Sequence, residues 1–330
     1  MPVSLPHTTV RLRPTRRTAM LPVREAVRQS CPAVLQQPQV AYCAHHTTAG
    51  FLDASARSQM GSKAEAVRPF VAAYRALFPH GAGYQHDQMH LRTELPPEQR
   101  RCEPRNADAH LAYMGAGLVA CTCTTPQEAL ALVDLDGVNR ETGRQRTRRV
   151  TAVGFASMHD VASFTVNVPA PPRAVGAVSL RDPRLGLMVR IQAVLSRHAV
   201  SWGCVELALE GAEPEAAEPE AALVVNEYET QLMRHDVARM LRAPRYFQTA
   251  AQVAAAASPN TDFYGTQAPV STPAMPKPAP ELRMHPAIRL LVQPADNGTS
   301  RLVQGRYQSP ILLHRKSKAY AVRVTVARCA

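Results

Sequence analysis

An order of predicted elements recurs on either side of a short segment of proline and alanine, residues 169–174, and this recurrence constrains the fold most. Before the segment, apolar periodicity and turn residues predict helix, strand, helix, long loop, short helix and three strands, at residues 21–35, 40–44, 63–78, 79–105, 107–114, 117–124, 130–135 and 149–155. After it the order returns, at residues 185–198, 203–209, 229–241, 288–292, 300–304 and 321–327. A repeated order of elements indicates a duplicated module. We therefore expect an α+β protein of two modules, residues 1–168 and 175–330.

The length of the chain agrees with two modules. With 330 residues it exceeds the usual size of one domain and can bury two cores of ordinary size. Residues 169–174 are the expected linker, because such a sequence extends and does not pack a core. Two other segments are expected to be loops: residues 212–221, where the sequence AEPEA stands twice, and residues 261–280, which hold five prolines.

The cysteines and the apolar runs bear on where the chain resides. Seven cysteines without framework spacing argue against a disulfide-built secreted domain. The first 24 residues carry five arginines and no acid, as transit peptides do, but they lack the apolar segment of a secretory signal. No apolar run approaches the roughly 20 residues that cross a bilayer. We expect a cytoplasmic protein without a membrane span, in which Cys121 and Cys123 share one buried strand face.

The formal net charge of +12 is compatible with nucleic acid, phosphorylated ligands or an anionic surface as partners. The basic clusters at residues 144–149 and 315–318 lack interleaved aromatic side chains, which argues against single-stranded nucleic acid. We expect these clusters to be solvated surface. A nucleic-acid-associated protein stays the third class of function, behind an enzyme and a binding or assembly protein.

Three histidines point to a definite chemistry. His46 follows a predicted strand and precedes the hydroxyls of Thr47 and Thr48, while His86 and His110 lie in later segments. Three histidines from separate elements, with a fourth position open to water or substrate, are typical of a catalytic zinc site. The alternative is that each histidine caps a turn or packs at the surface.

The motifs around these histidines resemble a known family. HTTAG at residues 46–50, GYQHD at 83–87 and AHL at 109–111 are similar, in this order, to motifs of the small bacterial YjbQ family of secondary thiamine-phosphate synthases. The resemblance covers about residues 20–155. It implies an α+β module with a largely antiparallel sheet and packed helices, usually assembled as a trimer. It also implies a divalent metal ion, with zinc expected, on His46, His86 and His110.

The second module resembles the same family through other motifs, VVNEYETQLMRHD at residues 224–236 and NGTSRLVQGRYQSPILL at 297–313. The position of the first family histidine falls near Glu218 and no AHL follows, so no metal is expected in this module. The asparagine and glutamate of the family are missing beside HTTAG, at residues 54–55, but stand at Asn226 and Glu227. Either the two copies share one composite site, or both have drifted and the second is a scaffold.

The resulting hypothesis is a metal-dependent enzyme acting on a small anionic or phosphorylated substrate, and the resemblance makes it thiamine-phosphate synthase-like. Asp87 is expected to orient a ligand or act as a base, and Glu227 to take a catalytic role. The expected substrate contacts are Thr47, Thr48, Asn226 and Gln308. The alternative is a non-catalytic binding or assembly protein that retains the fold and the metal. A homo-oligomer, such as a trimer, is expected in either case.

Overall fold

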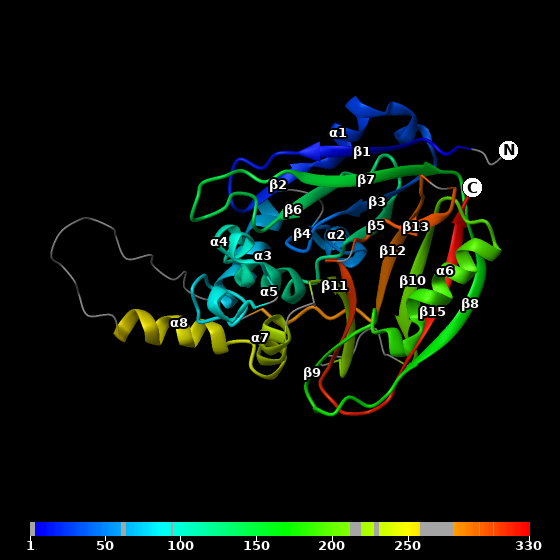
Figure 1. Ribbon diagram of the computed structural model, residues 1–330. Helices are drawn as coiled ribbons and strands as arrows, with labels where there is room; N and C mark the ends of the chain where they lie inside the picture. The colour runs from blue at the N-terminus through cyan, green and yellow to red at the C-terminus, as the bar shows by residue number, and fades with distance from the viewer. Residues whose placement is uncertain are drawn as a thin grey trace.

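The computed structural model describes residues 4–60, 64–93, 95–211, 219–227, 231–257, 280–296, 298–305 and 307–330 (Figure 1). The first half of the chain contains β1 (His7–Leu12), β2 (Ala19–Pro22), α1 (Val23–Ser30), η1 (Pro32–Gln36), β3 (Gln39–Ala44), β4 (Ala49–Gly50), α2 (Ala54–Met60), α3 (Ala64–Leu77), η2 (Met89–Leu91), α4 (Pro97–Cys102), α5 (Ala107–Gly115), β5 (Cys121–Thr124), β6 (Ala131–Asp134) and β7 (Arg148–Phe155). The second half contains β8 (Met158–Val168), β9 (Gly176–Ser179), η3 (Pro183–Leu185), α6 (Leu187–Arg197), β10 (Gly203–Leu209), β11 (Ala221–Asn226), α7 (Gln231–Arg242), α8 (Tyr246–Ala257), β12 (Ala287–Pro294), β13 (Ser300–Leu302), β14 (Ser309–His314) and β15 (Tyr320–Cys329).

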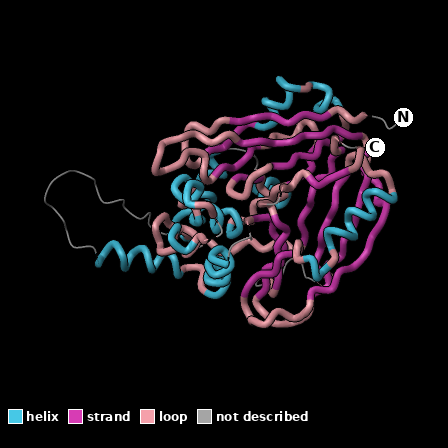
Figure 2. Tube along the Cα trace, viewed as in Figure 1, coloured by secondary structure: helices cyan, strands magenta, loops and turns pink. Residues whose placement is uncertain are grey.

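The two halves share one sheet topology. The first half forms a sheet of order β1-β7-β3-β5 and a smaller one of order β2-β6-β4. The second half repeats this with β8-β15-β10-β12, extended by β13, and with β9-β14-β11. All pairings between the described strands are antiparallel. The fold class is therefore α+β, with strands filling most of the molecule and most helices gathered at one end (Figure 2).

Local sequence explains the main elements. In α3, Val67, Val71 and Tyr74 are buried at helical spacing, so one face of this helix packs inward. Pro69 lies inside α3, where it lacks the N–H that would bond to the carbonyl of Glu65. β15 alternates between buried and partly exposed residues over most of its length, as a strand covered on one face does.

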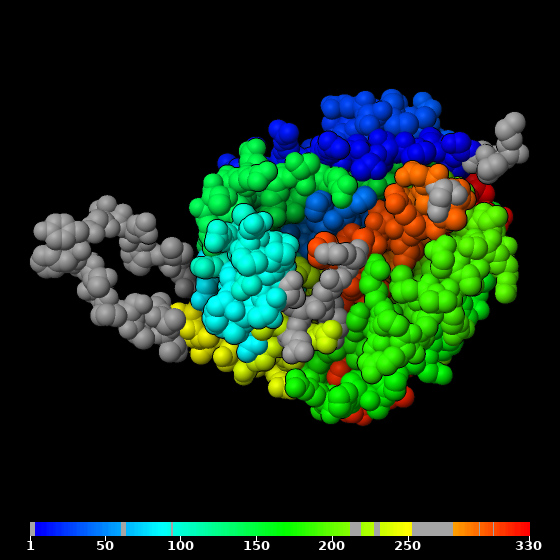
Figure 3. All heavy atoms as spheres, in the orientation of Figure 1, coloured from blue at the N-terminus to red at the C-terminus, as the bar shows by residue number. Residues whose placement is uncertain are grey.

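The core joins the two halves. One apolar cluster combines α3 and α5 with Val224 of β11 and Met233 of α7. Another combines β3, β5 and β7 with Trp202, Cys204 and Leu291 of the second half. In the space-filling view the two halves form one continuous body, with the first half at the top and the second sheet at the lower right (Figure 3). Apolar burial between the halves therefore stabilises their arrangement.

The strand pairings show to which half β8 and residues 169–174 belong. The expected boundary at residue 168 falls at the end of β8, yet β8 pairs with β15 along its whole length. Residues 169–174 connect β8 with β9, and β9 pairs with β14. By sheet membership the second half therefore begins at β8, and the expected linker lies inside it. The predicted loops at residues 212–218 and 261–279 lie outside the described residues.

Several strands were not predicted from the sequence, namely β1, β2, β4, β9, β11, β14 and the longer β8. The predicted helix at residues 21–35 is in fact α1 followed by η1, because Pro32 has no N–H to continue the α-helix.

All seven cysteines are free, and Cys121 is buried. In the described part of the chain no helix is both long enough and apolar enough to cross a membrane.

Candidate metal centre

Two histidines and a glutamate from both halves of the chain meet in the interior. One ligand atom from each of His86, His110 and Glu227 lies within 4.8 Å of the other two. Nε2 of His110 is 3.7 Å from one carboxylate oxygen of Glu227, and Nε2 of His86 is 3.9 Å from the other. Both imidazoles are buried, and the Glu227 side chain is 15% exposed.

His86 is held by two carboxylates, one at its backbone N–H and one at its ring. It lies in the loop between α3 and α4, three residues after Gly83, whose φ of +72° glycine adopts without strain. The Asp236 carboxylate of α7 accepts hydrogen bonds from the backbone N–H groups of Gln85 and His86, at 3.1 and 2.9 Å. Asp87 lies 3.1 Å from His86 Nδ1 and accepts the N–H of Ala107 at 3.0 Å. The loop is thereby fastened to α7 and to the start of α5.

His110 reaches the interior because α5 is buried along its full length. Its Nδ1 lies 2.8 Å from Oδ1 of Asn226, the last residue of β11. The amide of Asn226 also accepts the N–H of Glu227 at 2.7 Å and donates to the carbonyl of Thr47 at 3.0 Å. A backbone N–H can only donate and a carbonyl can only accept, so these two bonds determine which amide atom is oxygen.

These partners fix the tautomer of both histidines. Asp87 and the Oδ1 of Asn226 are acceptors, so His86 and His110 each carry a proton on Nδ1 and donate it. Burial lowers the pKa of His110, which keeps its imidazole neutral. Each Nε2 then carries a lone pair, which faces Glu227 in His110 and accepts from Arg92 in His86. Neutral histidines oriented through Nδ1 in this manner are typical of metal ligands.

Arg92 is a fourth member of the cluster that the sequence did not reveal. Its guanidinium is buried, with Nη1 at 3.1 Å from His86 Nε2 and Nη2 at 3.6 Å from Glu227. It lies six residues after His86 in the same loop, and no motif marks it. Asp236 was also given no role, although it belongs to the segment at residues 224–236 that carries the resemblance of the second half.

The other predicted site residues lie around the cluster or apart from it. His46, the third expected ligand, is not in the cluster: its Nε2 accepts the N–H of Arg149 at 2.7 Å. Burial and the nearby Arg148 lower the pKa of His46 to about 2. Thr47 contributes its carbonyl to Asn226, and the Thr48 hydroxyl lies 3.3 Å from Arg148. Glu227, and not His46, is the third member of the cluster with His86 and His110.

Gln308, an expected substrate contact, instead joins the two halves. Its amide nitrogen donates to the carbonyls of Ala44 and His46, at 2.8 and 3.1 Å. Both amide hydrogens are thus engaged beside the end of β3. The structure brings together His86, His110, Asp87, Asn226 and Glu227, and it places Gln308, Thr47 and Thr48 in the supporting layer.

Comparison with known proteins gives a likeness of fold alone. No protein-family model matches the chain, and no curated protein matches its sequence significantly. Among solved structures it is similar to a YbjQ-like protein of unknown function from Sulfolobus solfataricus P2, at 13% identity and a TM-score of 0.28, over 52% of this chain and 99% of that one. A hypothetical protein from Aeropyrum pernix K1 is similar at 12% identity and a TM-score of 0.28, over 50% of this chain and 98% of that one.

Proposed function

We propose that His86, His110 and Glu227 bind one divalent metal ion, with zinc as the expected ion, and that this centre acts on a small anionic, phosphorylated substrate. The observation that carries the proposal is the convergence of two imidazole lone pairs and one carboxylate in a buried place. The lone pair of His110 faces the Glu227 carboxylate with no proton between them, so these two groups repel, whereas His86 Nε2 accepts from Arg92. A cation among them removes this repulsion, as buried charges normally require.

The donor set fits such an ion. In a tetrahedral zinc site, adjacent nitrogen and oxygen ligands lie about 3.4 Å apart. The distances from histidine nitrogen to Glu227, 3.7 and 3.9 Å, end on different carboxylate oxygens, and the three ligand atoms lie within 4.8 Å of one another, so the ligands would move closer together around an ion. Small side-chain rotations would close the difference. Asp87 and Asn226 would hold the imidazoles in place while the ion binds.

Arg92 supports an anionic substrate. Its Nη1 now occupies the lone pair of His86, so it would rotate away when an ion binds. Its guanidinium would remain beside Glu227 and offer paired N–H donors, which suit phosphate and carboxylate groups. A bound divalent ion would supply a Lewis acid that neutralises negative charge on the substrate. Arg92 would hold a phosphate of the substrate. Glu227 would orient the substrate or accept a proton from it.

The motif resemblance favours one transfer reaction among those open to such a centre. The ring nitrogen of a thiazole phosphate would form a bond to the methylene carbon of a hydroxymethylpyrimidine diphosphate. The bond between that carbon and the diphosphate oxygen would break, which releases pyrophosphate. Arg92 lies where it would balance the charge of the departing diphosphate. Release of pyrophosphate from these two substrates, and its loss in Arg92→Ala, would support this activity.

We further propose that the chain arose by tandem duplication and that its site is composite. The identical strand order of both sheets in the two halves supports the duplication. The histidines come from the first half, whereas Asn226 ends β11 of the second half and Glu227 follows it; β11 is the counterpart of β4. A homo-oligomer, with a trimer as the expected form, stays a prediction that light scattering can test.

A second candidate is a non-catalytic binding or assembly protein. The contact of Arg92 with both His86 and Glu227 favours it, because arginine, histidine and glutamate then satisfy one another without an ion. In that case the cluster, with or without a bound ion, would stabilise the junction of the two halves and catalyse no reaction.

Metal analysis tests the proposed centre, and release of pyrophosphate separates the enzyme from the non-catalytic protein. After equilibration with zinc and removal of excess, we expect one ion per chain. His86→Ala, His110→Ala and Glu227→Gln should each weaken binding at least tenfold, since each removes a ligand or its charge. His159→Ala is the matched control, because His159 lies exposed on β8, and His46→Ala should retain the ion. An ion content near zero, or equal losses in the control, would contradict the proposed metal centre.

A further inference from the structure

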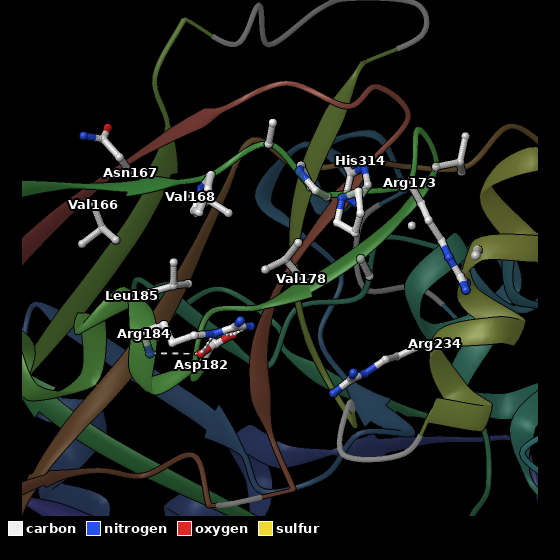
Figure 4. A pocket seen from close by; sticks show the side chains of 18 of the residues that line it. Val166, Asn167, Val168, Arg173, Val178, Asp182, Arg184, Leu185, Arg234 and His314 are labelled. Atoms are coloured by element: carbon white, nitrogen blue, oxygen red, sulfur yellow. Dashed lines mark hydrogen bonds and ion pairs between the residues drawn. The ribbon is translucent and has the colours of Figure 1, made fainter.

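A cavity lies in the second half of the molecule, away from the histidine cluster. Its volume is about 640 Å³, and it opens between the end of β8, β9, the start of α6 and one face of α7 (Figure 4). No residue of this cavity belongs to the proposed metal centre. Its lining therefore has to be explained separately.

The cavity carries an excess of positive charge. Four arginines line it, from three separate parts of the fold, against the single carboxylate of Asp182, a formal excess of three charges: Arg173, Arg184, Arg190 and Arg234. Like charges repel across such a space, so their gathering needs a compensating anion or extensive solvent. Exposed arginines alone are common. Here they surround one concave space, which distinguishes them from a scattered basic surface.

Arg184 and Arg190 contact neighbouring residues at one side of the cavity. Arg184 binds the carboxylate of Asp182 through Nε and Nη2, with distances of 3.0 and 2.6 Å. Arg190 donates to the carbonyl of Thr165 at 2.9 Å, and its guanidinium lies 4.1 Å from the centre of the Phe164 ring. These contacts fix both side chains at one side of the cavity. The ion pair with Arg184 also compensates the negative charge of Asp182, so this carboxylate does not oppose a bound anion.

The other two arginines border the opposite side. Arg173 extends from the loop between β8 and β9, and Arg234 extends from α7 (Figure 4). Within the residues that the structure describes, Arg173 makes no hydrogen bond or ion pair. The space between these arginines is apolar, since Val168, Val178 and Leu185 contribute its walls. Arginine side chains and apolar side chains thus line the same cavity.

We infer that this cavity binds a small organic anion, a phosphate ester with an apolar body, as a site separate from the histidine cluster. The volume lies within the range of small-molecule sites, which combine apolar walls with a few convergent polar groups. Guanidinium groups bind the oxygens of a phosphate in pairs. The valines and Leu185 cover the apolar body, and Arg173 and Arg234 bind the phosphate.

Calorimetric titration of the full chain with phenyl phosphate tests this site. We expect saturable binding that weakens as salt rises, and little binding of phenol, which lacks the charge. The double substitution Arg173→Gln with Arg234→Gln should weaken binding at least tenfold, because two charge-assisted contacts are lost. Both side chains are exposed, so the fold should be unaffected. Arg197→Gln, an exposed arginine of α6 outside the cavity, is the matched control.

Arginine modification then locates the bound anion. Phenyl phosphate should protect Arg173 and Arg234 from phenylglyoxal, as read by mass spectrometry. Protection of Arg92 instead would assign the anion to the histidine cluster and overturn the second site, while leaving the proposed function intact. Absence of binding at millimolar ligand, or equal binding by the double variant, would also overturn it.

Discussion

At the scale of single residues, the polar groups of the centre are ordered by what each can donate or accept. Asn226 shows this most clearly, because three bonds of one amide fix His110, the backbone of Glu227 and the chain at Thr47. Asp87 and Asp236 act on His86 in the same manner, one on its ring and one on its N–H. The orientation of the histidines is therefore a property of their neighbours.

His46 provides a test of stability against pH. Burial and the charge of Arg148 lower its pKa to about 2, so the folded chain keeps it neutral while the unfolded chain protonates it near pH 6.5. A lowered folded-state pKa contributes stability above the unfolded value, and that stability is lost as the pH falls below about 6.5. We expect His46→Gln, which retains an acceptor for the N–H of Arg149, to remove part of this loss.

The measurement is the free energy of unfolding by urea at pH 7 and pH 5. Since His46 is partly exposed, the wild type should lose up to about 1 kcal/mol more than His46→Gln between these values. Wild type and variant with the same pH dependence would contradict the assigned neutral state. His159→Gln, at an exposed position of β8, controls for a general effect of removing a histidine.

At the scale of elements, α7 contributes to both the histidine cluster and the basic cavity. Its Asp236 holds the loop of His86, whereas its Arg234 borders the basic cavity. Residues two apart on a helix point in different directions, so one helix serves both places. The sequence predicted α7 at nearly its observed position, because its apolar spacing is regular. It did not show which loop α7 would contact, since that depends on how the halves pack.

Asp236→Asn tests this link. Asparagine has one oxygen, so its NH₂ group would face either the N–H of Gln85 or that of His86, and the loop would lose one anchor. We expect zinc affinity, measured by competition with a chelating dye, to fall about 10-fold or more, with unchanged circular dichroism. Asp296→Asn, in an exposed turn, should retain the wild-type affinity. Full affinity in Asp236→Asn would show that the loop needs no anchor from α7.

The sequence predicted the regular elements better than the short ones. β3, β7, β10 and α6 have periodic apolar residues, and their predicted positions agree with the structure to within two residues. β4 has two residues and β9 four, too few for a pattern. The motifs pointed to His86, His110, Asn226 and Glu227, whose proximity depends on the packing of the two halves. Arg92 had no such signal, because a single arginine in a polar loop is ordinary.

At the scale of the whole molecule, the halves share their interior, so they should unfold together. Trp202, the only tryptophan, lies in a cluster with Ala41, Val153 and Phe155 of the first half. Its fluorescence therefore reports on the contact between the halves, while circular dichroism reports on all helices and strands. Coincident urea transitions by both probes are the expected result for one cooperative unit.

Phe155→Ala tests the same contact by leaving a cavity between the halves. Phe155 is fully buried, and truncating such a side chain removes its apolar burial without refilling the space. We expect the free energy of unfolding to fall by about 3–5 kcal/mol, with both urea transitions shifted equally. Val189→Ala is the control, because Val189 is 75% exposed and its truncation should change stability by less than about 0.5 kcal/mol. If the tryptophan transition moved alone, the halves would be separate folding units, and the histidine cluster at their junction would open before either half unfolds.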